Sequence, residues 1–377
     1  MLMYKEKLFC LILFHYYSLI NGKTCTPSSA RNSSIDDVPA ISKALSLCGN
    51  GGTIIIPAGE IFMIRSPLDF KECFHCFVQI EGILKISDDL QYWEGKTAFL
   101  LLSNVIRGTF YSLTGSGLID GNGQSYWDYF ARNQSYQRPL LIQMNNSSNI
   151  IFTKLKIINS PFWFFFVTNN STNIEFSDLS LSAISTSSNR PANTDGFDTG
   201  DCSYVTIKNL HVTNGDDCIS FKNGSNYIFV NNITCNGSHG LSVGSLGLES
   251  QRNYIVQNIF ISNVTMINSI VATRIKFYPG GPSYGTVIDN CYETDPMICK
   301  KYPSTAQLVD IKFKDLIGKT SKRYDPVVAR IDCPPLGICN LMFTNWNIVA
   351  PSGNSTVRCS YYEHPSGITC TPYEQNL

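Results

Sequence analysis

One short pattern of alternating apolar residues recurs along this chain, and it constrains the fold more than any other feature. The copies are "NIIFTKLKIINS" from Asn149, "NIEFSDLSLSA" from Asn173, "YVTIKNLHVTNG" from Tyr204, "YIFVNNITCNG" from Tyr227, "IFISNVTMINS" from Ile259, "VDIKFKDLIGK" from Val309 and "NLMFTNWNIVA" from Asn340. They are mostly spaced roughly 22 to 32 residues apart, with no long helical pattern between them. A repeat of one strand-bearing unit predicts the stacked coils of a solenoid.

The repeat predicts an all-β fold, a parallel β-helix. Strands of neighbouring coils would pair in parallel and stack their inward Ile, Val, Leu and Phe side chains. The Asn and Asp residues suit the turns, because they tolerate left-handed backbone. A β-sandwich is the competing interpretation, but it needs hairpins with turn signals every 8–12 residues. Residues 36–48, "DDVPAISKALSLC", predict a short N-terminal helix that caps the open end of the coil stack.

The first 22 residues are typical of a secretory signal peptide. Lys5 and Lys7 precede the apolar run "LFCLILFHYYSLI", which is followed by small and polar residues. A retained signal anchor is the alternative. No later stretch reaches eighteen apolar residues, so we expect no membrane span in residues 23–377, which we treat as one β-helix domain.

The cysteines fit an oxidising, extracellular compartment. There are fourteen, and Cys10 lies in the signal, which leaves thirteen. Close spacing suggests the pairs Cys25–Cys48, Cys73–Cys76, Cys218–Cys235, Cys291–Cys299, Cys333–Cys339 and Cys359–Cys370. Cys202 is left over, and we expect it to be a buried free thiol. Sequons such as those at Asn170 and Asn263 are abundant, so we expect a secreted glycoprotein.

Composition limits the classes of partner. Charged residues make up 15% of the chain, against about 25% in an average domain, and the formal net charge is zero. No global field attracts a polyanion, so we expect no nucleic-acid partner, and an anionic ligand must meet a few local cations. No pair of zinc-type CxxC motifs occurs. We therefore expect no metal and no cofactor, and a monomeric protein.

Acidic residues recur in phase with the repeat. Asp195 lies in "NTDGFDTG", Asp217 follows it by 22 residues in "NGDDCIS", and His239 follows Asp217 by another 22 in "GSHGLSVGS". Equivalent positions of successive coils lie about 4.8 Å apart, so these three residues should form a ladder on one face. Asp216 would stand beside it.

Two cations should join this ladder from the next coil. Arg274 and Lys276 lie two apart in "TRIKFYPG", so they project to the same side of a strand. A purely structural ladder of turn aspartates would explain one of these acids. It does not explain why two adjacent aspartates and two cations recur at the same position of successive coils. Two or three carboxylates across a groove suit glycoside hydrolysis, in which one donates a proton and another activates water. Arg and Lys beside them favour a uronic acid substrate.

At these motifs the sequence resembles the polygalacturonase family of glycoside hydrolases, family 28. The matches are "NTDG" at 193–196, "DDC" at 216–218, "GSHGLSVGSLG" at 237–247 and "RIK" at 274–276. The resemblance implies a right-handed parallel β-helix that hydrolyses α-1,4 bonds of polygalacturonate, a pectin polymer, with inversion and without a metal. "NGDDC" and "GSHG" are most similar to fungal exo-polygalacturonases.

The resemblance also implies roles for individual residues. Asp216 would be the general acid, while Asp195 and Asp217 would position and deprotonate the attacking water. His239 would maintain the protonation of Asp216 through the hydrogen-bond network.

The substrate-binding roles follow in the same way. Arg274 and Lys276 would bind a galacturonate carboxylate, Asn193 would orient the aspartates, and Gly240 would let the substrate approach the backbone. The aromatic run "PFWFFFV" at 161–167 holds more rings than an alternating strand can bury, so one or two of them could face the substrate.

Several alternatives stay open. An endo-polygalacturonase or a xylogalacturonan hydrolase would carry the same residues. A catalytically silent pectin-binding protein is a different class, and the short segment at 277–291, possibly one coil less than in relatives, motivates it. Pectate lyase would need calcium, which the Asp cluster could bind, but that reading leaves the His and "RIK" motifs unexplained.

Overall fold

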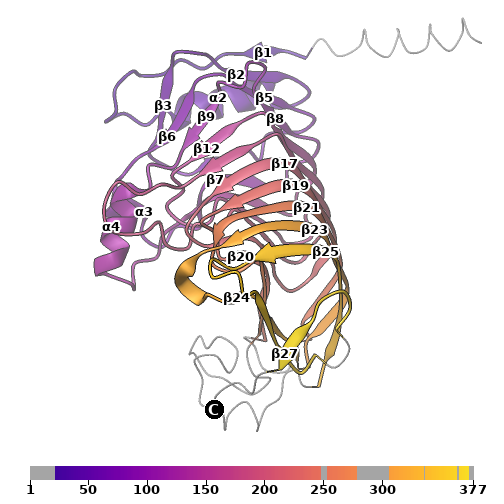
Figure 1. The fold of residues 1–377 in the computed structure, drawn as a ribbon. Coiled ribbons are helices and arrows are strands. Elements are labelled where there is room, and N and C mark those ends of the chain that lie inside the picture. Colours follow the sequence, from indigo (N-terminus) through magenta and orange to yellow (C-terminus); the bar gives the residue numbers. More distant parts are fainter. Residues whose placement is uncertain (1–21, 248–252, 278–304, 335, 363–364, 373–377) are drawn as a thin grey trace, which may run out of the picture.

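The computed structural model describes residues 22–247, 253–277, 305–334, 336–362 and 365–372. Within these ranges the strands form two sheets, of 16 and 11 strands, and the strand pairs are parallel. No hairpin pairing is present among the described strands, so the parallel β-helix is confirmed and the sandwich is wrong. Figure 1 shows the coils stacked from the N-terminal end to the C-terminal end.

The larger sheet forms one long wall of the solenoid. Its strands are β1 (Thr24–Cys25), β2 (Thr53–Ile56), β3 (Ile61–Ile64), β5 (Phe77–Ile80), β6 (Ile83–Ile86), β8 (Thr109–Tyr111), β9 (Leu118–Asp120), β11 (Ser148–Thr153), β12 (Lys156–Ile158), β14 (Thr172–Ser177), β15 (Ser180–Ser182), β17 (Cys202–Thr213), β19 (Ser225–Asn236), β21 (Ile255–Ser269), β23 (Gln307–Thr320) and β25 (Ile338–Val349). Strands β17 to β25 are visible in Figure 1 as successive rungs from pink to yellow. The repeated runs of the sequence therefore correspond to rungs of this sheet.

The smaller sheet forms the wall that carries the candidate site. Its strands are β4 (Leu68–Asp69), β7 (Ala98–Ser103), β10 (Leu140–Asn145), β13 (Phe165–Thr168), β16 (Phe197–Thr199), β18 (Asp217–Phe221), β20 (Gly240–Leu246), β22 (Thr273–Phe277), β24 (Val327–Asp332), β26 (Thr356–Ser360) and β27 (Cys370–Pro372). Strand β22 pairs with β24, and β21 with β23, so these coils are direct neighbours. The expected shortening falls largely within 278–304 and lies outside the described residues.

Apolar ladders between the two sheets form the core. Phe110 stacks on Phe152 with ring centroids 4.5 Å apart, and Phe165 stacks on Phe197 at 5.2 Å. Each of these rings is at most 1% exposed. Burying one such side chain contributes roughly 1.5–3 kcal/mol, so repeated ladders can hold the coils in register.

Asparagine and aspartate turn the chain between rungs, as expected. Asn209 and Asn232 adopt φ of 57° and 54° and lie in the bends of β17 and β19. Their amides form a polar ladder: Nδ2 of Asn232 donates to Oδ1 of Asn209 at 3.0 Å, and Nδ2 of Asn209 donates to Asp178 at 3.2 Å. Short polar side chains tolerate this left-handed backbone better than most residues, which explains why they recur there.

Helices lie at the end and along the side of the coil stack. Helix α2 (Val38–Cys48) contacts β1 to β4 and buries Ile41 and Leu45, which confirms the N-terminal cap. Helix α3 (Leu90–Trp93), helix α4 (Gln124–Arg132) and the 3-10 turn η1 (Lys322–Tyr324) complete the set. None of the helices in the described ranges is long and apolar enough to cross a bilayer. The expected signal peptide falls almost entirely in residues 1–21, outside the description.

Five of the six expected disulfides are present in the described residues. They are Cys25–Cys48, Cys73–Cys76, Cys218–Cys235, Cys333–Cys339 and Cys359–Cys370. Cys202 is a buried free thiol, as expected, and burial raises its pKa to about 12. The expected pair Cys291–Cys299 lies outside the described residues.

Candidate active site

Successive rungs of the smaller sheet bring the acidic motifs together. Phe197 of β16 pairs with Ile219 of β18, so Asp195 and Asp217 occupy equivalent places two residues earlier. The backbone N–H of Gly196 donates to the carbonyl oxygen of Asp217 at 3.0 Å, which joins the two segments. The 22-residue spacing therefore aligns these two aspartates as expected.

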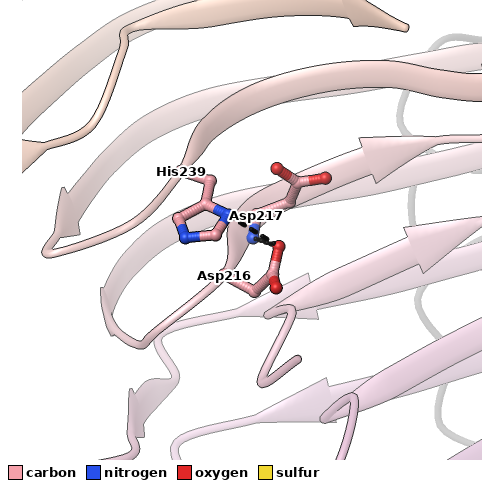
Figure 2. Close-up of side chains that lie close together, drawn as sticks. All are labelled: Asp216, Asp217 and His239. Atoms are coloured by element: carbon pink, nitrogen blue, oxygen red, sulfur yellow. Dashed lines mark hydrogen bonds and ion pairs between the residues drawn. The ribbon is translucent and has the colours of Figure 1, made fainter. Parts of the chain in front are cut away.

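His239 departs from the expected ladder by one residue. Gly240, not His239, pairs with Asp217, and the register then shifts so that Ile219 pairs with Leu241. His239 lies against Asp216 instead: its backbone N–H donates to the carbonyl oxygen of Asp216 at 2.7 Å, and Nδ1 is 3.0 Å from Oδ1. Figure 2 shows the imidazole beside the Asp216 carboxylate. The ladder of Asp195, Asp217 and His239 is corrected accordingly, because a bulge absorbs the extra residue.

The Asp216 carboxylate receives three hydrogen bonds. Oδ1 accepts from His239 and from the backbone N–H of Asp217 at 2.9 Å, and Oδ2 accepts from Nδ2 of Asn193 at 3.3 Å. Burial opposes ionisation of Asp216, but the bond from His239 and the charge of Lys276 bring its pKa below the ordinary value. Donation from His239 to Oδ1 favours the ionised form of Asp216 in the ligand-free arrangement. The expected role of His239 in maintaining the protonation of Asp216 stays a prediction.

Asp217 is buried and neutralised by both cations of the "RIK" motif. Nη2 of Arg274 and Nζ of Lys276 each lie 2.8 Å from one of its oxygens, and the hydroxyl of Ser242 donates to Oδ1 at 2.7 Å. Burial again opposes ionisation, yet these partners hold the pKa of Asp217 well below its usual range. The expected pairing of Arg274 and Lys276 on one side of the strand is confirmed, but in this state they face Asp217.

Asp195 has the opposite electrostatic environment. Its side chain is nearly inaccessible, and the residue is 5% exposed. Burial, together with the charges of Asp216, Asp198 and Asp217, raises its pKa well above the ordinary value. In the ligand-free protein the cluster thus holds one carboxyl whose pKa favours its proton, Asp195, and two whose pKa values favour ionisation, Asp217 and the expected general acid Asp216.

A second ion pair, formed by Asp198 three residues after Asp195, was missed from the sequence. Nζ of Lys222 is 2.8 Å from Oδ1 of Asp198, which is fully buried, and the ammonium also lies 4.4 Å from the ring centroid of Trp163. Burial raises the pKa of Asp198 to about 6, with Lys222 opposing the rise. A signal was present, because Asp198 precedes Ser220 and Ser242 by steps of 22 residues in the same phase.

The glycines serve the neighbouring coil. At Gly240, with φ of 110°, a Cβ atom would lie 2.5 Å from the carbonyl oxygen of Val271, and at Gly244 it would lie 2.0 Å from that of Lys276. Glycine is required there because the next rung approaches closely. The idea that these glycines admit a bulky ligand is therefore not needed, and a substrate contact of Gly240 stays a prediction.

The rings of the aromatic run divide between buried and partly exposed positions, but they do not alternate along the chain. Phe164 and Phe165 are fully buried, while Phe162, Trp163 and Phe166 are partly exposed. Trp163 stacks on Phe162 with ring centroids 5.0 Å apart, and Nζ of Lys222 lies 4.4 Å from its ring centroid. A contact between one of the partly exposed rings and the substrate stays a prediction.

Three ligand-type side chains in this cluster lie close enough to share a metal ion. Ligand atoms of Asp216, Asp217 and His239 all fall within 4.8 Å of one another. Both oxygens of Asp217 already bond to cations, so a divalent ion would have to approach Arg274 and Lys276. This charge arrangement disfavours calcium and favours proton chemistry.

The arrangement matches a known family. The family model "Glycosyl hydrolases family 28" matches residues 52–283. The chain belongs to glycosyl hydrolase family 28. The resemblance inferred from the motifs is thereby confirmed, and the three aspartates, His239 and the "RIK" motif are present in this family 28 chain at one place in the fold.

Two fungal proteins are similar to this family 28 chain over nearly its whole length. Endo-xylogalacturonan hydrolase A of Aspergillus tubingensis is 45% identical over 92% of this chain and 90% of the relative, and a probable endo-xylogalacturonan hydrolase A of Aspergillus niger is 45% identical over 94% and 92%. The crystal structure of the endo-xylogalacturonan hydrolase from Aspergillus tubingensis superposes with a TM-score of 0.85 at 44% identity, covering 93% of this chain and 99% of that one. A polygalacturonase from Erwinia carotovora, 17% identical with a TM-score of 0.61 over 92% and 97%, shows the fold alone. The expected similarity to exo-acting enzymes is not supported, because these fungal relatives are named as endo-acting.

Proposed function

We propose that this family 28 chain is a secreted, monomeric hydrolase that cleaves α-1,4-galacturonosyl bonds within a xylose-substituted galacturonan. The observation that carries the substrate is the 45% identity, over nine-tenths of both chains, to a protein named endo-xylogalacturonan hydrolase. The exo action expected from "NGDDC" and "GSHG" gives way to the alternative, endo action on xylogalacturonan. Secretion is supported by the disulfides and sequons, and neither a metal nor nucleic acid enters the proposal.

The reaction is a single displacement. Asp216, whose side chain is 14% exposed, donates a proton to the leaving glycosidic oxygen as the bond to the anomeric carbon breaks. Water, positioned by Asp195 and Asp217, attacks that carbon from the opposite face and passes its proton to Asp217, the member of the pair that favours ionisation. One bond to the carbon breaks on one face while the bond to water forms on the other, so the configuration inverts and no covalent sugar–enzyme intermediate forms.

Substrate binding is the step that protonates Asp216. In the free protein Lys276 helps to keep Asp216 ionised, while Arg274 and Lys276 neutralise Asp217. A galacturonate carboxylate that engages these cations weakens both attractions and adds a negative charge nearby. Both changes raise the pKa of Asp216 and make Asp217 a stronger base. The substrate thus prepares the acid and the base together.

Product analysis tests this proposal. The purified protein is incubated with xylogalacturonan and with unsubstituted polygalacturonate, and the products are sized at less than five per cent conversion. A ladder of oligomers, formed faster from the xylose-bearing polymer, is the expected result. Release of monogalacturonate alone would establish exo action instead. Binding to either polymer with no turnover would support the silent pectin-binding alternative and overturn the proposal.

A further inference from the structure

Arg138 is a buried cation that the reaction described above does not use. It lies between α4 and β10, and it is 7% exposed. Its guanidinium carbon is 3.7 Å from the ring centroid of Phe130, in α4, and 4.9 Å from that of Phe162. Both rings lie against the guanidinium, and burying a charge in this way is costly unless its donors are satisfied.

The donors of Arg138 reach the segment just before Asp195. Nη1 donates to the carbonyl oxygens of Pro161 at 3.0 Å and Ala192 at 2.7 Å, and Nη2 donates to Oδ1 of Asn193 at 2.7 Å. A guanidinium has no acceptor, so the amide of Asn193 must present its oxygen to Arg138. Its Nδ2 then points away, toward Oδ2 of Asp216 at 3.3 Å.

We propose that Arg138 is a positioning residue for the general acid: by fixing the amide orientation of Asn193, it aims Oδ2 of Asp216 at the scissile bond. The inference rests on the proposed role of Asp216. Oδ1 is held by His239 and the Asp217 backbone, so Oδ2 is the oxygen left to carry the transferable proton. Without Arg138 the amide can turn over and set its own oxygen against the carboxylate, which repels it.

Charge alone would be a competing explanation. The charged and titratable groups around Asp216 are His239, Asp217, Asp195, Lys276 and Arg138. Burial lowers the pKa of Arg138 to about 10, so it stays cationic throughout the acidic range in which the enzyme is expected to work. The two explanations differ in whether a lysine, which keeps the charge but lacks the planar fork, can replace it.

The test combines Arg138→Lys, Arg138→Met and Asn193→Gly. Glycine suits position 193 because Asn193 has φ of 54°, so this variant removes the amide without straining the backbone. Misplacing a catalytic group by about 1 Å costs on the order of 100-fold. We expect kcat to fall about 10- to 100-fold in all three variants while KM changes less than about threefold, since substrate contacts remain.

A double-mutant comparison isolates the link. If Arg138 acts through Asn193, the double variant Arg138→Met with Asn193→Gly loses no more kcat than Asn193→Gly alone. Multiplying losses, or full activity of Arg138→Lys, would overturn the proposal. Arg132→Met, an exposed arginine in α4, is the control and should match the parent.

A crystal structure of Arg138→Met adds a readout that needs no turnover. We expect Asn193 to turn over or to move away from Asp216. An unmoved Asn193 that still donates to Oδ2 would overturn the positioning role. Absence of turnover in the parent protein would instead count against the proposed function, because this structural readout is independent of substrate. Asn193→Gly keeps the kinetic test informative even if Arg138→Met does not fold.

Discussion

His239 contacts Asp216 twice from the next coil: Nδ1 lies 3.0 Å from the carboxylate Oδ1, and the backbone N–H donates to the Asp216 carbonyl oxygen at 2.7 Å. The second contact belongs to the rung pairing of the solenoid, so the fold itself sets the position of the imidazole. The first contact favours the ionised form of Asp216 in the ligand-free protein. Together they tie the protonation of the proposed acid to the coil register.

Replacing the proposed acid should abolish turnover but not binding. For Asp216→Asn we expect kcat to fall by about 10²–10⁴-fold, because an amide cannot donate the proton. This is the rate enhancement that a positioned general acid usually contributes. Binding of a non-cleaved oligomer, measured by calorimetry, should stay close to that of the parent. Asp178→Asn is the matched control, because Asp178 is exposed and has φ of 54°, which asparagine accepts. Unchanged kcat in Asp216→Asn would remove Asp216 from the mechanism.

The activity should have a bell-shaped dependence on pH, with its maximum in the acidic range. The acid limb reports protonation of Asp217, whose pKa is held low by Lys276 and Arg274. The alkaline limb reports the loss of a proton that Asp195 and Asp216 share. In the free protein, burial and the repulsion between the two carboxylates keep this proton on Asp195. Measurements of kcat/KM between pH 3 and 9 test this pH profile. A flat profile up to pH 9 contradicts the assigned roles.

Removing one cation should shift the acid limb. In Lys276→Met the Asp217 carboxylate keeps Arg274 and Ser242 but loses one ion pair, so its pKa rises toward the ordinary value. A carboxyl whose pKa is lower in the folded than in the unfolded protein stabilises the fold at pH values above its unfolded-state pKa. That stabilisation is lost as the pH falls through the folded-state pKa. Because the folded-state pKa of Asp217 is higher in this variant, both activity and stability are lost at a higher pH than in the parent. KM should rise at least about tenfold if a buried charged contact to the sugar carboxylate is lost.

The control for that experiment is Lys312→Met. Lys312 also pairs with an aspartate, Asp310 at 2.8 Å, but on the other sheet and with more than a third of its side chain exposed. Its loss should change neither the pH profile nor KM. If Lys276→Met leaves the acid limb where it was, the cation does not tune Asp217.

Asp195→Asn should stabilise the protein while inactivating it. Because the pKa of Asp195 is raised in the folded protein, its carboxyl lowers the stability of the fold at pH values above its unfolded-state pKa. At such pH values folding requires either that Asp195 takes up a proton or that a like charge is buried. An amide of the same shape avoids both. At pH 7 we expect the free energy of unfolding to rise by about 0.5–2 kcal/mol, which raises Tm by a few degrees. At pH 3 we expect little difference in Tm. A lower Tm at pH 7 would contradict the electrostatic account.

The disulfide next to Asp217 should matter to catalysis more than the one at the cap. Cys218–Cys235 closes 17 residues and directly follows Asp217, while Cys25–Cys48 closes 23 residues at the N-terminal end. Each double Cys→Ala variant should lose roughly 2–4 kcal/mol of unfolding free energy. Only the first should also lower kcat, measured at a temperature where both variants are folded. Equal kcat in both would show that the bridge does not position Asp217.

Sequence patterns were sufficient where the chemistry follows the repeat. Asp195 and Asp217 differ by one coil of 22 residues, and coils without insertions bring such positions together. The same count misplaced His239 by one residue, because a single bulge between Asp217 and Ile219 has no mark in the letters. The exo expectation failed for a related reason, since it depended on two short motifs rather than on the whole chain.

Residues outside the repeat could not be found in this way. Arg138 lies in "NQSYQRPLL", a connection with no periodic phase, and only folding carries it to Asn193, 55 residues away. Asp198 was in phase with Ser220 and Ser242, but neither Asp198 nor Lys222 lies in a distinguishing motif. Their pairing depends on which face each rung presents.

The sequence by itself determined the coiled architecture and the set of acids. Residues one repeat apart in the chain stack on one another in the solenoid, and the same apolar contact is repeated in coil after coil. The tertiary structure decided which carboxyl keeps a proton. That outcome depends on burial and on contacts of about 3 Å from His239, Arg274 and Lys276, and electrostatic energies change steeply over such distances.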